Sequence, residues 1–294
     1  LYSFEAHPNN TTRAHLEVLH SLGFTRNSFG IQDYDPVVQK AINRIQSFED
    51  VRAVTEMSRE VGYQSVSHDL VFGLPHQSES AMQRTIDLTA ELRPDRIAFY
   101  SYAHVPWIKG TGQRGYDEKD LPSNEGKRKL YEIGKERFLA LGYEEIGMDH
   151  FALPEDSLAK AYHSGSLHRN FMGYTSGKTR LMVGLGMSSI SDSWGGFAQN
   201  VKTVAAYENQ ALKNEIPVFR GHMLSNEDLV IRKHILQLMC QFETSFESEV
   251  DRFPDMQTCL EKLDEMEKDG LVQRDGFQLT VTPKGRPFVR NVCM

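Results

Sequence analysis

The stretch Ser65-Val-Ser-His-Asp-Leu-Val-Phe-Gly-Leu-Pro75 reads as a buried strand followed by a tight turn. The polar side chains of Ser67 and Asp69 alternate with larger ones, so one face of the strand is polar and small. The Gly-Leu-Pro turn precedes a helix predicted over residues 79–92. A strand has little structural reason to hold a carboxylate near its carboxyl end, so Asp69 indicates a binding site.

Two earlier segments have the same form as this strand. Strands are predicted at Tyr2–Ala6 and Arg26–Gln32, with Glu5 and Gln32 near their carboxyl ends. A fourth strand is predicted at Arg96–Ala103, and helices separate all four. Strand, helix, strand is typical of a parallel sheet, in which the carboxyl ends meet at one edge. We therefore expect the three polar side chains to lie together at the mouth of a barrel.

The connecting helices have start signals in the sequence. Asn10 or Thr11 is expected to cap the first helix. Asp35-Pro36 combines a capping residue with a proline at the first helical position, which predicts a short second helix. Ser47 and Asp50 have the spacing of a capping box, which predicts the start of the third.

The middle of the chain is predicted less regularly. Residues 105–123 are expected to be a loop, and a helix is expected to follow from residue 123. A strand is predicted around Glu145–Phe151, and Leu181–Ser191 is expected to return to the same sheet. These elements complete an α/β fold, a partial (βα)6-type barrel over residues 1–221.

The character of the sequence changes at about residue 222. A helix that follows Ser225, a second helix over about 256–269 and a hairpin around Arg274-Asp275-Gly276 predict a winged-helix-like domain over residues 222–294. Such domains often read DNA. Here Asp and Glu outnumber Lys and Arg, and the helix that would enter a groove is acidic, so phosphates would be repelled. A structural module is favoured over a DNA reader.

Composition narrows the classes of protein further. The 294 residues carry a net charge of −7, and the pI of about 5.9 favours neither nucleic acid nor an anionic membrane as a partner. The sequence has no apolar run of membrane-spanning length and no signal-peptide pattern. Its three cysteines, Cys240, Cys259 and Cys293, are far apart, which favours a reducing, cytoplasmic setting.

Several motifs resemble one family. Asp69-Leu-Val-Phe-Gly-Leu-Pro75 resembles a strand and turn of the radical S-adenosylmethionine enzymes related to oxygen-independent coproporphyrinogen III oxidase. Other blocks match in order and at fitting spacing: Phe4-Glu-Ala-His-Pro8, Ser28-Phe-Gly-Ile-Gln-Asp33, Asn43-Arg44, Gly147-Met-Asp-His-Phe151 and His168-Arg-Asn-Phe-Met-Gly-Tyr-Thr175. The last two are more similar to the coproporphyrinogen oxidase family than to its relatives. The resemblance runs along essentially the whole chain.

The resemblance implies a set of contacts to S-adenosyl-L-methionine. Glu5 would bind its ammonium group and Arg44 its carboxylate, for which a planar guanidinium is suited. Gln32 and Asp69 would hydrogen-bond the ribose hydroxyls. The positions that would line the adenine are Ala103 and Ile190.

Each of these residues also has a structural interpretation. Glu5 could pair with a nearby arginine, and Arg44 could satisfy carbonyls at a helix C-terminus. Gln32 and Asp69 could cap the helices that follow them. Four such residues in register, all near strand ends or an adjoining loop, favour the cofactor over four separate structural roles.

Four further residues are candidates for contacts to substrate. Asp149, His150, His168 and Arg169 lie in segments predicted as long loops, and they could meet carboxylates or pyrrole N–H groups of a porphyrinogen. Solvated surface positions are the alternative. No His-x-x-x-His spacing supports a zinc site, and no residue is assigned a catalytic role.

The family's chemistry needs a [4Fe–4S] cluster held by Cys-x-x-x-Cys-x-x-Cys. The three cysteines of this chain lie at intervals of 19 and 34 residues and do not form this motif. We therefore expect a fragment that lacks the N-terminal cluster-binding region. The 294-residue polypeptide is predicted to be inactive, whereas the parent protein would receive an electron from a donor to its cluster.

The function implied by the resemblance is that of an oxidoreductase of haem and porphyrin biosynthesis. Its parent would convert coproporphyrinogen III to protoporphyrinogen IX without oxygen, through a 5′-deoxyadenosyl radical that abstracts a propionate hydrogen before carbon dioxide is lost. One alternative is a haem-chaperone-like relative with the same barrel. Another, from a different class, is a non-enzymatic winged-helix or tetrapyrrole-binding module. Titration with coproporphyrin, S-adenosylmethionine and duplex DNA would separate these classes.

Overall fold

The computed structural model describes residues 2–105 and 116–294. The chain forms two compact units, residues 1–159 and residues 160–294. The expected domain boundary between residues 221 and 222 falls inside the second unit, and it stays a prediction. Of the loop predicted over residues 105–123, residues 106–115 lie outside the described part of the chain.

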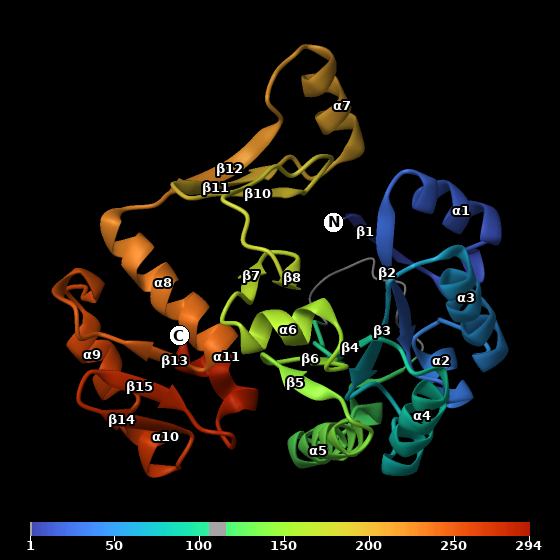
Figure 1. The fold of residues 1–294 in the computed structure, drawn as a ribbon, viewed down its shortest axis with the longest axis horizontal. Helices are drawn as coiled ribbons and strands as arrows, with labels where there is room; N and C mark the ends of the chain where they lie inside the picture. The colour runs from blue at the N-terminus through green and yellow to red at the C-terminus, as the bar shows by residue number, and fades with distance from the viewer. Residues whose placement is uncertain (1, 106–115) are drawn as a thin grey trace. The chain divides into compact units, whose positions relative to one another are not determined.

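A six-stranded sheet is the centre of the first unit (Figure 1). Its strands in chain order are β1 (Tyr2–Ala6), β2 (Phe24–Gln32), β3 (Ser65–Phe72), β4 (Arg96–Ser101), β5 (Glu144–Ile146) and β6 (His150–Ala152). The order across the sheet is β1-β2-β3-β4-β6-β5, and the first four strands run parallel. The predicted run of parallel strands is confirmed, and β1 and β3 have the predicted bounds.

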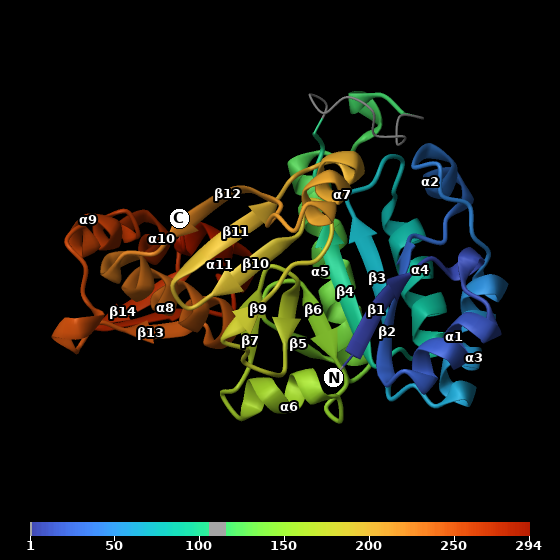
Figure 2. The ribbon, with the colours of Figure 1, turned by 90° about the horizontal axis from the view of Figure 1, so that it is seen from above.

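The helices of this unit connect the strands. They are α1 (Arg13–Ser21), α2 (Pro36–Ala41), α3 (Phe48–Val61), α4 (Glu79–Leu92) and α5 (Asn124–Ala140), with α6 (Ser157–His163) crossing into the second unit. Figure 2 shows α1, α3 and α4 along one side of the parallel strands. This is the arrangement in which one face of a sheet is buried and the other stays free.

Two of the predicted helix starts are confirmed, and one is wrong. Asp35 accepts hydrogen bonds from the first N–H groups of α2, and the Ser47 capping box opens α3. The first helix begins later than predicted, because Pro8–Asn10 forms a 3-10 turn of its own. Thr12, and not Asn10 or Thr11, is therefore the residue that caps α1.

The apolar face of the sheet packs against the helices and forms the core. Its largest buried side chains are Leu16, Phe29, Ile31, Leu70, Met82, Ile86, Ile97, Phe99, Leu130, Phe138 and Phe151. Packing in this core is tight, since a Cβ on Gly134 of α5 would lie only 2.3 Å from the Phe99 ring. The core therefore uses one face of the strands, which leaves the polar face available for a ligand.

The strand predicted at Glu145–Phe151 is a hairpin instead. β5 and β6 pair antiparallel with each other, and β6 also pairs antiparallel with β4. Gly147, between them, has a φ of +62°. Glycine takes positive φ without the strain that a Cβ causes, so the chain reverses at the point where the alternation suggested one continuous strand.

The prediction that Leu181–Ser191 returns to the parallel sheet is wrong. Its two ends belong to a separate four-stranded antiparallel sheet of the second unit, made of β9 (Leu181–Met182), β10 (Ile190–Ser193), β11 (Gly196–Asn200) and β12 (Val218–Met223). Gly186 and Ser188, between β9 and β10, have φ values of +95° and +60°. A strand cannot continue through two left-handed residues.

The second unit has further helices and strands, which lie before, between and after the strands of this sheet in the sequence. They are β7 (His168–Asn170), β8 (Gly173–Thr175), α7 (Val204–Leu212), α8 (Asn226–Gln241), β13 (Glu243–Ser245), α9 (Met256–Glu261), α10 (Asp264–Lys268), β14 (Val272–Asp275), β15 (Gln278–Val281) and α11 (Val289–Val292). The strands β13, β15 and β14 form a three-stranded sheet in that order, which includes the predicted hairpin at Asp275-Gly276.

The helix predicted over residues 256–269 is divided into α9 and α10. The Arg274 guanidinium, from the neighbouring strand, donates to the carbonyl oxygen of Leu260 at 2.9 Å. A continuous α-helix would offer that oxygen to the N–H of Asp264. At the break this oxygen instead accepts from the Leu263 N–H at 3.1 Å, as in a 3-10 turn, and the Arg274 guanidinium adds a second bond.

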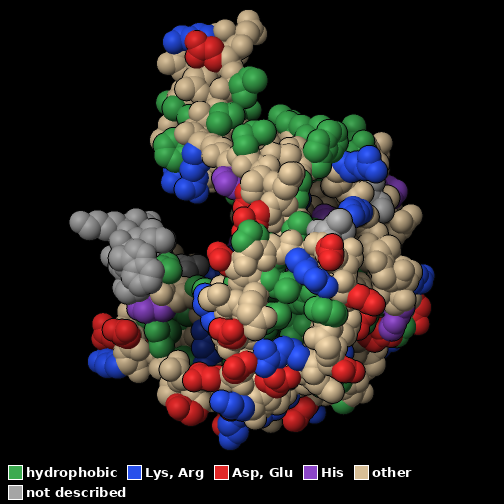
Figure 3. All heavy atoms as spheres, turned by 90° about the vertical axis from the view of Figure 1, so that its left-hand side faces the viewer, with side chains coloured by type: hydrophobic (Ala, Val, Ile, Leu, Met, Phe, Trp, Pro, Cys, Tyr) green, Lys and Arg blue, Asp and Glu red, His purple; other side chains and the backbone are tan. Residues whose placement is uncertain are grey.

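Exposed apolar side chains gather on α7 and on the four-stranded sheet. Leu212, Ile216 and Met223 are 82–85% exposed, and Figure 3 shows hydrophobic side chains in green over this part of the second unit. Within the described residues, no helix combines the length and the hydropathy that crossing a membrane requires.

Candidate functional site

A row of paired residues crosses the polar face of the first unit's sheet. Gly30 of β2 pairs with Asp69 of β3, Asp69 pairs with Ala98 of β4, and Ala98 pairs with His150 of β6. Paired residues on neighbouring strands point to the same face of a sheet. The predicted site residue Asp69 and the predicted substrate contact His150 therefore share one face, separated only by an alanine.

Asp69 is held by its neighbours on β2 and β1. Its Oδ1 accepts a hydrogen bond of 2.8 Å from the Ser28 hydroxyl, and Ser28 in turn pairs with Glu5 across β1 and β2. Burial raises the pKa of Asp69 from its ordinary value of 3.8 to about 6. The Ser28 hydrogen bond lowers that pKa, Glu5 raises it and Arg44 lowers it. Asp69, Glu5 and Arg44 are thus close enough to act on one another electrostatically.

Arg44 reaches back over β2 from the loop after α2. Its Nη2 donates to the carbonyl oxygen of Gly30 at 2.6 Å. Its Nε is buried and has no hydrogen-bond partner among the described residues. Burial lowers the pKa of Arg44, and Asp69 opposes that shift. A buried guanidinium with an unused donor is a group that can receive a carboxylate.

Gly30 makes room for two of the candidate side chains. A Cβ at this position would lie 2.7 Å from Arg44 Nη2 and 2.9 Å from Gln32 Nε2. Gln32 itself has a φ of +70°, at an irregularity in the pairing of β2 with β3. This unusual backbone turns the Gln32 amide toward the position above Gly30. The structure thus brings Glu5, Gln32, Arg44 and Asp69 together around one point of the sheet.

The helix-capping interpretations of these residues do not agree with the structure. Asp35 caps α2 and Ser78 caps α4, so neither Gln32 nor Asp69 is the capping residue. The Arg44 guanidinium bonds a strand carbonyl, not the C-terminus of a helix. The cluster therefore has no such structural explanation, and its role in cofactor binding stays a prediction.

The two predicted adenine contacts lie in different units. Ala103 is exposed and follows β4, at the carboxyl end of the parallel strands, where the preceding Tyr102 N–H donates to the Phe72 carbonyl oxygen. Ile190 is the first residue of β10 in the second unit and is half-buried. Only Ala103 therefore belongs to the same unit as the Asp69 cluster.

The predicted substrate contacts divide in the same way. Asp149 and His150 belong to the β5–β6 hairpin, and the His150 ring lies 5.7 Å from that of Tyr100. His168 and Arg169 belong to β7 in the second unit. The Arg169 guanidinium stacks over the Tyr174 ring at 4.5 Å, and its Nη1 is buried without a partner among the described residues.

Ser28 belongs to this cluster, although the motif analysis left it without a role. Its hydroxyl holds the Asp69 carboxylate in place. The sequence did contain a signal, because Ser28 and Gly30 lie on the polar side of the alternation in β2. The alternation shows on which face Ser28 lies, but it does not show which residue of the neighbouring strand Ser28 meets. The register between β2 and β3 gives that partner.

The described residues contain no cluster of His, Cys, Asp and Glu that could hold a metal ion. The three cysteines are free: Cys240 is buried, Cys293 is half-buried and Cys259 is exposed. Burial raises the pKa of Cys240 and of Cys293 to about 11, so both are thiols at neutral pH. These residues do not fit a [4Fe–4S] cluster, which needs three converging thiolates.

Comparison with known proteins gives one family. The model of the radical SAM superfamily matches residues 2–89. The oxygen-independent coproporphyrinogen III oxidase of Synechocystis sp. is 40% identical, over 99% of this chain and 64% of its own length. The protein of that name from Escherichia coli K12 is 38% identical, over 99% of this chain and 65% of its own length. The chain thus spans slightly under two thirds of the length of these relatives.

A solved structure is similar over nearly the whole chain. It is that of coproporphyrinogen III oxidase (HemN) from Escherichia coli, described as a radical SAM enzyme. The TM-score is 0.93 at 37% sequence identity, and the match covers 99% of this chain and 68% of that one. Both units of the present chain therefore have counterparts in that structure.

Proposed function

Because this chain belongs to the oxygen-independent coproporphyrinogen III oxidase family of radical SAM enzymes, we propose that it serves the oxidative decarboxylation of coproporphyrinogen III. The product would be protoporphyrinogen IX, and the process haem biosynthesis without oxygen. The observation that carries the proposal is the convergence of Glu5, Gln32, Arg44 and Asp69 around Gly30. Two acids, a guanidinium and an amide at one point suit a zwitterionic nucleoside.

The four side chains fit S-adenosylmethionine by their chemistry. Glu5 is exposed and acidic, which suits the ammonium group, and the unused Nε of Arg44 suits the carboxylate. Asp69 accepts from Ser28 through Oδ1, and its second oxygen can accept from a ribose hydroxyl. When bound and reduced by one electron, S-adenosylmethionine supplies the radical chemistry that removes hydrogen from an unactivated carbon.

The cluster that would deliver that electron does not fit the residues of this chain, so we derive no step through it. We propose that Asp149, His150, His168 and Arg169 contact the substrate, and that a separate donor supplies the electron. The free cysteines favour a cytoplasmic setting. No nucleic-acid partner is proposed, since Arg274, beside the acidic α10, is already held by Asp264 and Glu267 at 2.7 and 2.5 Å.

Calorimetric titration with S-adenosylmethionine tests the proposal on this chain. We expect Glu5→Gln to weaken binding about tenfold, because a hydrogen bond to a charged group contributes about 1.5–3 kcal/mol. Glu56→Gln is the matched control, since Glu56 is an exposed acid on α3, away from the polar face. Equal affinities for the wild type and Glu5→Gln would contradict the proposed site.

A further inference from the structure

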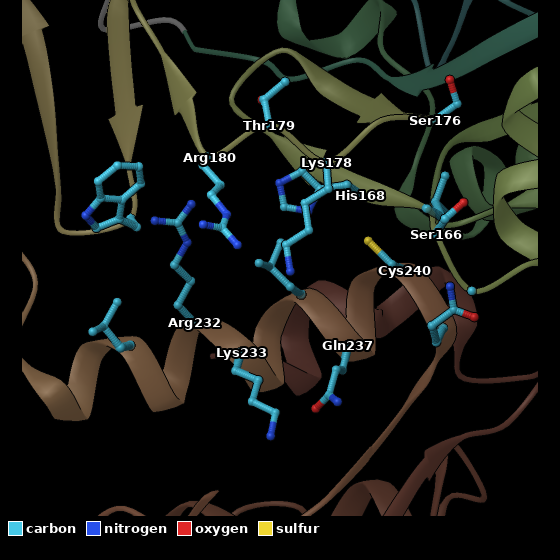
Figure 4. A pocket seen from close by; sticks show the side chains of 16 residues that line it. Ser166, His168, Ser176, Lys178, Thr179, Arg180, Arg232, Lys233, Gln237 and Cys240 are labelled. Atoms are coloured by element: carbon cyan, nitrogen blue, oxygen red, sulfur yellow. The ribbon is translucent and has the colours of Figure 1, made fainter.

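A cavity of about 740 Å³ lies in the second unit, between α8 and the segment that follows β8 (Figure 4). Its size is within the range of about 300–1,000 Å³ that is typical of small-molecule sites. The walls come from residues 165–168, 176 and 178–180, from Trp194 and from one side of α8. All of these residues belong to the second unit, so the cavity is complete within it.

The charged side chains that line this cavity are all basic. They are Lys178, Arg180, Arg232 and Lys233, and none of the described residues that line the cavity is acidic. Arg232 is paired with Asp192 at 2.8 Å, and Lys233 with Asp251 at 2.6 Å. In the described parts of the chain, Lys178 and Arg180 have no ion pair. The cavity therefore holds two uncompensated positive charges.

Arg180 and Arg232 extend into the same part of the cavity from opposite walls, one from the loop and one from α8 (Figure 4). Asp192 already neutralises Arg232, so the Arg180 guanidinium is the one that lacks a counter-ion among the described residues. His168 does not add to the charge at neutral pH. Burial lowers its pKa, and the nearby Lys178 and Arg232 lower it further.

The uncharged lining adds a donor and apolar surface. Gln241 lines the cavity and carries a buried Nε2 that has no hydrogen-bond partner among the described residues. Trp194 is 68% exposed, and Leu229 and Leu236 of α8 also line the cavity. An indole and two leucines suit a flat apolar body, whereas the cations and the amide suit acceptors at its edge.

We propose that this cavity binds the substrate's carboxylate side chains, with Lys178 and Arg180 as the principal contacts and Trp194 against the macrocycle. The ligand class is a flat tetrapyrrole that carries several carboxylates. This inference rests on the proposed function, since that function supplies the tetrapyrrole. It adds residues that none of the family motifs identified, because Lys178, Arg180 and Trp194 lie outside all of them.

The experiment measures equilibrium binding of coproporphyrin III, a stable tetrapyrrole with four carboxylates, by fluorescence. The double variant Lys178→Ala/Arg180→Ala is compared with the wild-type chain. We expect at least tenfold weaker binding, because two charge-assisted contacts are lost. The control Lys213→Ala/Arg84→Ala removes the same two charge types from exposed positions outside the cavity, and it should bind like the wild type.

Two further measurements separate recognition from folding. The charge-preserving variant Lys178→Arg/Arg180→Lys should recover most of the affinity, and thermal unfolding should be the same for all variants to within a few degrees. Coproporphyrin tetramethyl ester has the same ring without the charges, and the alanine variant should not change its affinity. If citrate displaces coproporphyrin III at equal concentration, the site recognises carboxylates alone, and the proposed role of Trp194 is wrong.

Three outcomes would overturn the inference. They are equal coproporphyrin III affinity in the wild type and the alanine variant, an equal loss in the control variant, and no binding by the wild type. Titration with S-adenosylmethionine on the same proteins distinguishes this from a failure of the proposed function. If S-adenosylmethionine binding depends on Glu5 but coproporphyrin III binding does not depend on Lys178 and Arg180, the proposed function stands. Only the inference about this cavity is then wrong.

Discussion

The polar face of the first unit and the basic cavity of the second arrange their charged side chains in different ways. Around Gly30, charges of both signs are half-buried, and strand register fixes them against one another. In the cavity, the unpaired charges are of one sign and are exposed at Lys178 and Arg180. A mixed cluster suits a zwitterion of fixed shape, whereas a basic cavity suits a polyanion. The two regions thus predict different ligands and different responses to mutation, pH and salt.

The largest expected effect is the loss of cluster binding and of catalysis. It concerns both regions, since neither supplies converging thiolates. We expect anaerobic reconstitution of the 294-residue polypeptide to give no [4Fe–4S] cluster and no decarboxylation, because Cys240, Cys259 and Cys293 do not form a three-thiolate site. Iron analysis, absorption spectra and an assay for vinyl formation would check this. Turnover together with about four irons per chain would show the prediction to be wrong.

The next largest effect is that of a substitution at Gly30, which should change ligand binding at the first region alone. Gly30→Ala adds a Cβ that must displace the ends of Arg44 and Gln32, which are flexible enough to move without unfolding the chain. We expect S-adenosylmethionine affinity to fall about tenfold, as for the loss of one charge-assisted hydrogen bond. Coproporphyrin III affinity should stay the same.

Gly126→Ala is the matched control for Gly30→Ala. A Cβ at Gly126 in α5 would make only ordinary contacts at 3.5 Å. Calorimetry should therefore give wild-type affinity for both ligands. A Gly30→Ala chain that binds S-adenosylmethionine normally would mean that Arg44 and Gln32 do not act together on the ligand.

The pH response should follow Asp69. Its pKa is raised to about 6, so the carboxylate that accepts a ribose hydroxyl is lost as the pH falls through 6. We expect S-adenosylmethionine affinity to fall up to about tenfold between pH 7 and pH 5, since one proton is taken up. Asp69→Asn should remove this dependence while the rest of the protein titrates as before. A wild-type affinity that is flat over this range would contradict the prediction.

The smallest effect is that of salt. Exposed charges are screened over about 10 Å at 0.1 M salt, and half-buried ones are screened less. Between 50 and 500 mM sodium chloride we expect coproporphyrin III binding to weaken about threefold to fivefold, and S-adenosylmethionine binding by less than half as much. The same titrations in both salts measure the difference. If the two affinities decreased equally with salt concentration, the two regions would not differ in solvent exposure as proposed.

Local sequence signals predicted the elements whose causes are themselves local. The Asp35-Pro36 cap and the Ser47 capping box involve atoms within three residues of each other, and both formed as expected. The bounds of β3 and α4 followed from alternation and from the turn between them. The strand prediction at residues 181–191 was wrong. The apolar pattern of this segment is typical of a strand, but left-handed residues inside it interrupt the extended backbone.

The sequence by itself determined the family, the run of parallel strands and the three polar residues near their ends, with Arg44 in an adjoining loop. These depend on side-chain type and spacing along one chain. Tertiary structure alone decided that Arg44 lies over Gly30, that Ser28 holds Asp69, and that Lys178 and Arg180 share a cavity with α8. Each of these contacts joins residues at least 14 positions apart, so strand register and helix packing, which no local pattern encodes, had to bring them together.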